Sequence, residues 1–137
     1  MRIIKLYEGF LDKMYEKLPE VKLIMALANF MNIVKPELKC KYMRNSDGLW
    51  ILSNDKERLI YLEIFHTDVQ ITFFAHHKEE YTDKIELDIL DFLFEVFDTD
   101  IVDVDIYKDD IPVAISKLTK ENYDIFLTKK FANKYNL

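Results

Sequence analysis

Glycine is scarce in this chain, and the scarcity excludes two common nucleotide-binding sites. Gly9 and Gly48 are the two glycines in 137 residues, and they lie far apart. P-loops and dinucleotide-binding turns need several glycines close together, because the backbone must approach a phosphate. The sequence therefore excludes both. Three prolines leave little material for a flexible linker, and we expect residues 1–137 to form a single domain.

Cysteine is nearly absent as well. Cys40 stands alone, which excludes an intrachain disulfide and a cysteine-based zinc site. This composition favours a reducing, cytoplasmic location. Lys39 and Lys41 flank Cys40, and such charges can lower the pKa of a thiol. No partner histidine is identifiable from any pattern, however, and a lone cysteine on a strand is more often a packed small residue than a nucleophile.

Long apolar runs are also missing. The longest charge-free apolar stretch, residues 23–34, has 12 residues, whereas a membrane-spanning helix needs about 20. Glu8 and Asp12 interrupt the first residues where a signal peptide would be apolar. We therefore expect neither a membrane span nor a signal peptide. With 50% hydrophobic and 32% charged residues, the composition is typical of a folded protein.

Hydrophobic periodicity predicts an α+β fold. Apolar side chains at three- and four-residue spacing predict helices over 1–39, with a break at Pro19, over 83–98, and from the N-cap Thr119 onward. Alternating side chains predict strands over 39–45, 48–54, 58–65, 69–77, 100–107 and 111–118. Because the strands cluster, we expect an antiparallel sheet of about five to six strands, packed with N-terminal, central and C-terminal helices.

The predicted helix over 83–98 has two different sides. Its inner side, which we expect to face the sheet, carries Ile85, Ile89, Phe92, Leu93 and Val96. Its polar stripe consists of acidic residues, namely Asp88, Asp91, Glu95 and Asp98. On the next predicted strand, Asp103 and Asp105 alternate with apolar residues, so one face of that strand is expected to be buried and the other wet and acidic.

These acidic residues belong to an uneven charge distribution. Residues 79–110 contain 13 acidic residues and two lysines, a net charge of −11, whereas the other 105 residues carry a net charge of +5. Like charges on one helix stripe repel at a cost of roughly 0.2–0.5 kcal/mol per pair. One interpretation of the acidic residues is a solvated face that keeps the protein soluble. Alternatively, they form a docking face for a basic protein, whose association such charge accelerates.

The docking hypothesis names a set of partner-binding residues. They are Asp88, Asp91, Glu95, Asp98, Asp103, Asp105, Tyr81 and Tyr107. The two tyrosines are included because aromatic side chains anchor protein interfaces. Charge reversal at Asp91 and Glu95 is expected to weaken binding and to leave folding intact. An acidic face also excludes a nucleic-acid partner, because phosphates attract Lys and Arg.

The sequence gives little support for a catalytic site or a metal site. His76 and His77 precede Glu79 and Glu80, but adjacent strand residues point to opposite faces and cannot easily share one metal. Five aspartates between residues 100 and 110 lack the glycine of a calcium-binding loop. The Asp/Glu-x-Lys pattern of nucleases is not cleanly present near Lys108. We therefore expect no catalytic residue, cofactor or metal.

Residues 58–118 resemble immunity proteins of bacterial polymorphic-toxin systems. The resemblance lies in the strand VQITFFAHHKEEY, the acidic helix after it, and the segment DIVDVDIYKDDIPVAISKL. It implies a small acidic α+β protein of the cytoplasm that binds and blocks a toxin domain. The leading hypothesis is therefore a non-enzymatic inhibitor of a basic toxin, such as a nuclease. Two alternatives are a phage-type anti-defence protein that mimics nucleic-acid phosphates, and a ligand binder or enzyme that uses His76 and the aromatic sheet.

Overall fold

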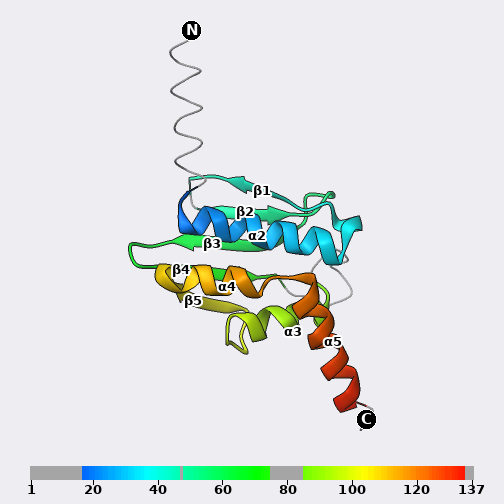
Figure 1. Ribbon diagram of the computed structural model, residues 1–137. Coiled ribbons are helices and arrows are strands. Elements are labelled where there is room, and N and C mark those ends of the chain that lie inside the picture. Colours follow the sequence, from blue (N-terminus) through cyan, green and yellow to red (C-terminus); the bar gives the residue numbers. More distant parts are fainter. Residues whose placement is uncertain (1–16, 47, 75–84, 135–137) are drawn as a thin grey trace.

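A five-stranded antiparallel sheet forms one layer of the protein. The computed structural model describes residues 17–46, 48–74 and 85–134. The strands lie side by side in the order in which they occur along the chain (Figure 1). They are β1 (Lys41–Arg44), β2 (Leu49–Leu52), β3 (Arg58–Ile64), β4 (Asp68–Phe73) and β5 (Asp103–Tyr107). β1 and β5 are therefore the two edges of the sheet.

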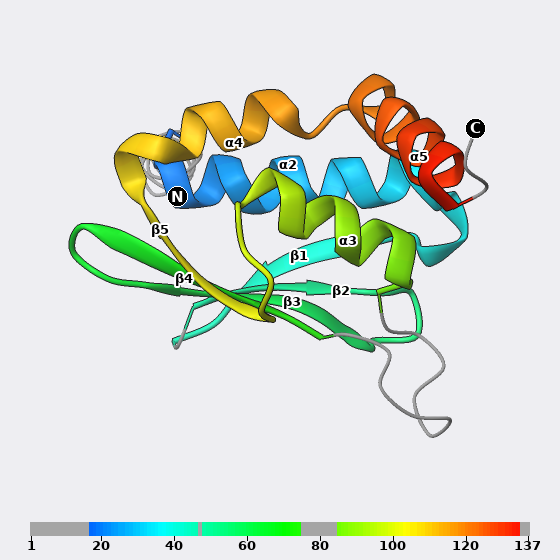
Figure 2. The same cartoon turned by 90° about the horizontal axis from the view of Figure 1, so that it is seen from below.

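The helices form the second layer. They are α2 (Pro19–Val34), η1 (Pro36–Leu38), α3 (Leu87–Val96), η2 (Lys108–Asp110), α4 (Ile111–Lys117) and α5 (Lys120–Lys134). The four α-helices lie on one side of the sheet, and no described helix covers the opposite face (Figure 2). This two-layer arrangement confirms the predicted α+β class. None of the helices in the described ranges is long and apolar enough to cross a membrane.

Side-chain alternation explains how the sheet meets the helices. On β4, Val69, Ile71 and Phe73 are buried beneath the helix layer, whereas Gln70 and Thr72 between them point to the open face. α2 packs against the first three strands and against α4. This explains why apolar residues line more than one of its sides.

α3 presents its predicted side to the core. Its apolar face is buried, as the sequence spacing indicates: Ile85, Ile89, Phe92, Leu93 and Val96. The helix begins at Leu87, later than predicted, because Ile85 is still extended and its N–H donates a hydrogen bond to the Phe74 carbonyl at 3.3 Å. It ends at Val96, so Asp98 lies beyond the helix.

The prediction of a strand over 111–118 is wrong, because this segment forms α4. Its β-branched residues favour a strand, but Ile111, Ala114, Ile115 and Leu118 also follow helical spacing, and these four side chains are turned toward the core. Pro112 occupies the first turn of the helix, where its missing N–H costs nothing. In a strand, the same proline would lose a ladder hydrogen bond.

The strands predicted over 39–45 and 48–54 correspond to β1 and β2, which pair antiparallel as a hairpin. Gly48 is needed for close packing, since a Cβ atom there would lie 2.1 Å from the Leu62 carbonyl oxygen. The Thr119 N-cap is also confirmed, because its Oγ1 accepts a hydrogen bond from the Asn122 N–H at 3.1 Å. The helix expected over residues 1–16, together with Tyr81, His76 and His77, lies outside the described residues.

Candidate protein-binding surface

Tertiary structure divides the predicted acidic site into two groups. Asp88, Asp91 and Glu95 lie on α3, in the helix layer. Asp103 and Asp105 lie on β5, and their cross-strand neighbours Thr72 and Gln70 place them on the open face of the sheet. The two groups therefore belong to different surfaces of the protein.

The α3 group is partly neutralised within the molecule. Lys130 of α5 places its Nζ 2.7 Å from a carboxylate oxygen of Asp88 and 2.7 Å from one of Asp91. These two hydrogen bonds raise the pKa of Lys130 above its ordinary value. The pairs attach α5 to α3, so Asp88 and Asp91 already have a cationic partner.

Glu95, the third predicted residue on α3, lies among charges of both signs. It borders a hollow of about 380 Å³ between α3 and α5, which Lys117 and Lys129 also line. Apolar side chains, including Phe92 and Ile125, complete the hollow. Charges of both signs therefore surround Glu95, so this region does not present a purely negative surface to a basic partner.

The β5 group continues into the turns on both sides of the strand. Asp98 and Asp100 precede β5, and Asp109 and Asp110 follow it within η2. We call the six residues the β5 acidic edge: Asp98, Asp100, Asp103, Asp105, Asp109 and Asp110. Within the described ranges, none of the six carboxylates forms a salt bridge. Asp103 accepts a hydrogen bond from the Thr72 hydroxyl at 2.8 Å, which fixes its side chain on the open face.

Asp98 is placed where an aspartate is locally unfavourable. Its φ is 51°, a left-handed conformation for which helix ends favour glycine. The Asp98 and Thr99 N–H groups donate to the carbonyls of Glu95 and Phe94 at 3.3 and 2.9 Å, the Schellman pattern that ends a helix. A negative charge at a helix C-terminus is also repelled by the helix dipole. The charge of Asp98 therefore works against the stability of α3.

A hollow of mixed polarity lies beside the β5 acidic edge. It has a volume of about 260 Å³ and lies between the end of α3, β5 and α4. Val96, Ile106 and Ala114 supply apolar lining, and the charged lining consists of Asp98, Asp105, Asp110 and Lys117. Close by, the predicted interface residue Tyr107 is 67% exposed and Val113 of α4 is 57% exposed. Apolar contact area surrounded by charge is the usual composition of a protein interface.

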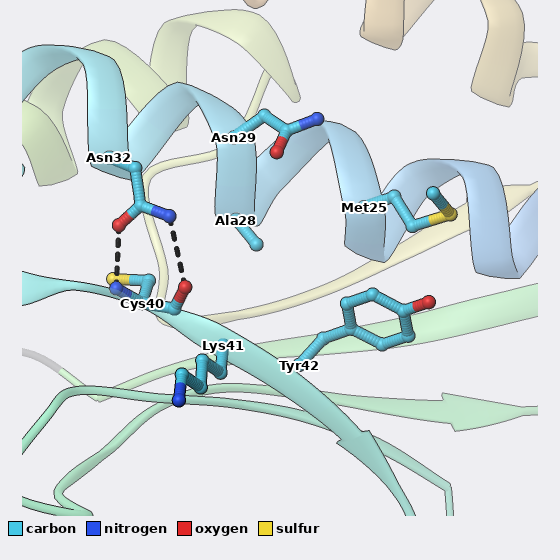
Figure 3. Close-up of a pocket in the computed structure, with 7 residues that line it drawn as sticks. All are labelled: Met25, Ala28, Asn29, Asn32, Cys40, Lys41 and Tyr42. Atoms are coloured by element: carbon cyan, nitrogen blue, oxygen red, sulfur yellow. Dashed lines mark hydrogen bonds between the residues drawn. The ribbon is translucent and has the colours of Figure 1, made fainter.

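A second groove, between α2 and β1, contains Cys40. Asn32 hydrogen-bonds to the backbone of Cys40, the residue before β1. Its side-chain amide N–H donates to the Cys40 carbonyl at 2.9 Å, and its amide oxygen accepts from the Cys40 N–H at 2.5 Å (Figure 3). Burial raises the pKa of the Cys40 thiol to about 11, so it stays protonated at neutral pH. In Figure 3, Lys41 points away from the helix. Cys40 is buried, which agrees with its interpretation as a packed residue.

The open face of the sheet carries the aromatic residues considered as a ligand site. Trp50 stacks on Tyr61 with ring centroids 4.2 Å apart and on Phe74 at 6.1 Å, and the Arg58 guanidinium lies 4.8 Å from the Trp50 ring. The rings thus pack against one another. His76, the polar group of that alternative, lies outside the described residues.

Metal ligation was the remaining alternative. The described part of the chain contains no group of three His, Cys, Asp or Glu residues able to hold a metal ion. The aspartates around β5 are spread along a strand and two turns, and so do not converge. The cluster weighed and rejected in the sequence, His76, His77, Glu79 and Glu80, lies outside the described residues.

Sequence reasoning missed the residues that act across elements. The sequence signal for Lys130 is weak: Asp88 and Asp91 stand three residues apart on one helix face, and Lys129 and Lys130 are adjacent within the last helix. Such a spacing allows one cation to bridge two carboxylates. The hydrogen bonds between Asn32 and Cys40 depend on the turn through η1, which the sequence pattern does not indicate.

Comparisons with known proteins give no assignment. No protein-family model matches the chain, and no curated protein and no solved structure shows significant similarity to it. The function is therefore argued from the charges and geometry of the chain itself.

Proposed function

We propose that this protein binds a basic protein through the β5 acidic edge and blocks it sterically, without catalysing a reaction. The observation that carries this proposal is the gathering of six carboxylates along β5 and its flanking turns with no salt bridge among the described residues. Lys108 and Lys117 lie near these carboxylates, but the acidic residues outnumber them, and a predominantly negative patch attracts and orients a positively charged partner.

The local cost of Asp98 supports a role for the charge. Solubility is obtained from charge at any exposed position, whereas Asp98 occupies a left-handed helix end beside the helix dipole, where glycine or a neutral residue is favoured. Residues that reduce local stability are typical of functional surfaces. The position of this carboxylate beside the hollow is therefore better explained by binding than by solubility.

The hollow and its exposed neighbours supply the second component of an interface. Complementary charge mainly raises the association rate and the specificity of binding, whereas buried apolar contacts supply most of the affinity. Tyr107 and Val113 are exposed beside the hollow, so a partner that neutralises the aspartates also covers apolar area. A nuclease-type toxin fits this description, because an enzyme that binds nucleic-acid phosphates carries Lys and Arg on its active face.

The test uses a pair of variants with the same change in net charge. Asp103→Lys/Asp105→Lys alters the edge, and Glu37→Lys/Asp55→Lys alters two exposed residues elsewhere. Each protein serves as bait in lysate of the native host. We expect wild type and the control to capture a basic protein that the edge variant does not capture, and the purified captured protein to lose its activity on addition of wild type. Equal capture by the edge variant, or an acidic partner, contradicts the proposal.

A further inference from the structure

The outer edge of β5 has backbone groups that pair with no other described strand. In the antiparallel β4–β5 ladder, the Phe73 N–H donates to the Val102 carbonyl at 2.8 Å and the Lys108 N–H donates to the Thr67 carbonyl at 3.0 Å. Hydrogen-bonded pairs alternate with non-bonded pairs along such a ladder. The bonded residues of β5 are consequently Val104 and Ile106.

The other residues of β5 therefore direct their N–H and C=O groups away from β4. They are Asp103, Asp105 and Tyr107. β5 is the last strand of the sheet, and no other described strand pairs with its outer edge. The end of α3 lies near this edge, on the helix side of the sheet (Figure 2). Just before the opposite edge strand β1, the Asn32 amide pairs with the backbone N–H and carbonyl of Cys40.

The side chains around this edge define what an added strand would need. Residues placed opposite Asp103 and Asp105 share their face of the sheet, so basic side chains there meet two carboxylates. The residues between them point to the helix side, where the hollow lined by Val96, Ile106 and Ala114 lies. The edge thus suits a segment in which basic and apolar residues alternate.

A second copy of this chain does not suit the edge. Pairing β5 with another β5 would bring aspartates beside aspartates, and like charges on neighbouring strands are destabilising. Edge strands commonly use charge to prevent pairing with their own kind. The same aspartates favour a strand of opposite charge.

We propose that β5 accepts an extended segment of the partner as an additional antiparallel strand, with basic side chains beside Asp103 and Asp105 and apolar side chains in the hollow. This inference rests on the proposed function and names its binding mode. Strand addition of this kind takes affinity from main-chain hydrogen bonds and specificity from alternate side chains.

The test uses an acetylated, amidated heptapeptide of alternating lysine and valine. Opposite residues in a bonded antiparallel pair exchange both hydrogen bonds, so the lysine amides of the peptide face β5 and the valine amides face solvent. N-methylation of the lysine amides should weaken binding roughly tenfold or more, and N-methylation of the valine amides should leave it within about twofold. Binding is followed by NMR titration of the full chain, where amide exchange should slow at Asp103, Asp105 and Tyr107.

Variants of the protein provide the matching evidence. Tyr107 has a φ of −68°, which proline also adopts, so Tyr107→Pro removes an outward N–H without changing the charge. It should raise the dissociation constant roughly tenfold, whereas the control Tyr107→Ala keeps the N–H. Thermal melting identifies any loss of folding, and the methylated peptides test the edge independently of the variant.

The outcomes separate the two proposals. Equal binding of the two methylated peptides, weaker binding of the valine-methylated one alone, or unchanged exchange at β5 overturns antiparallel strand addition. If the captured host protein still requires Asp103 and Asp105, the acidic edge remains its docking site and the binding mode alone is wrong. If capture of the host protein does not require Asp103 and Asp105 either, both proposals are wrong.

Discussion

The acidic stripe of α3 and the β5 acidic edge look alike in the sequence and differ in the folded protein. On α3, Asp88 and Asp91 share the ammonium group of Lys130 at 2.7 Å. Along β5 and its turns, the six carboxylates form no salt bridge among the described residues. The comparison teaches that the density of charge along a chain does not locate a binding surface. What matters is whether folding supplies the counter-charge.

Removing a buried apolar side chain from α3 should have the largest effect on stability, because α3 carries the acidic stripe and its end packs beside the β5 acidic edge. Leu93 is fully buried, and Leu93→Ala should reduce the free energy of unfolding by about 2–5 kcal/mol. Urea denaturation measures this change. The exposed Leu87 gives a matched control, and a loss below about 1 kcal/mol for Leu93→Ala would contradict its assigned burial.

Association kinetics should separate the two acidic regions directly. Asp103→Asn/Asp105→Asn should slow association with the captured basic partner by about tenfold at low salt, since steering depends on unneutralised charge. Asp88→Asn/Asp91→Asn should slow it by less than about threefold, because the same long-range field is already reduced by Lys130. Stopped-flow measurements over a range of salt concentrations test both. Equal slowing by the two variants would remove the distinction between the regions.

The ion pairs of Lys130 should contribute modestly to stability. Lys130 is 35% exposed, and an exposed pair contributes about 0.2–1 kcal/mol. Lys130→Met removes both ion pairs and should lower the free energy of unfolding by about 0.2–1 kcal/mol for each pair. It should also weaken the attachment of α5 to α3. The same geometry revises the expectation for Asp91→Lys/Glu95→Lys, which now places a lysine beside Lys130 and should destabilise the fold. Denaturation of both variants, compared with Lys129→Met, provides the measurement.

The contribution of Lys130 should depend on pH. Its pKa is raised in the folded state above the ordinary value of 10.5, so its stabilisation is fully present below pH 10.5 and is lost as the pH rises through the higher folded value. Burial, followed by the charge of Asp88, likewise raises the pKa of Tyr123 above 10.0, and ionisation of Tyr123 then opposes folding. Unfolding of wild type and Lys130→Met should therefore converge at alkaline pH, and a constant difference would exclude the ion pairs as its cause.

The smallest effect should come from Asp98, and it should have the opposite sign. Asp98→Asn removes the charge that the dipole of α3 repels and keeps a residue that tolerates the left-handed conformation. We expect a gain of about 0.3–1 kcal/mol in the free energy of unfolding, together with slower association with the partner. A variant that is less stable than wild type would show that the carboxylate serves the helix rather than the surface.

Much of the fold could be predicted from local patterns. The spacing of Ile89, Phe92, Leu93 and Val96 indicates the buried side of α3, and Thr119 caps α5 as expected. The segment Ile111–Leu118 was assigned wrongly because its composition favours a strand while its spacing also fits a helix. In a short apolar segment the packing decides between the two, and α4 packs on α2.

The sequence by itself determined the α+β class, the buried faces of the main elements and the presence of excess acidic charge in one segment. These features depend on side-chain period and composition, which neighbours along the chain already specify. Only the tertiary structure decided which carboxylates remain without a cation, because Lys130 lies 39 residues from Asp91 along the chain. It also decided that β5 ends the sheet with outward backbone groups, since the order of strands depends on long-range packing.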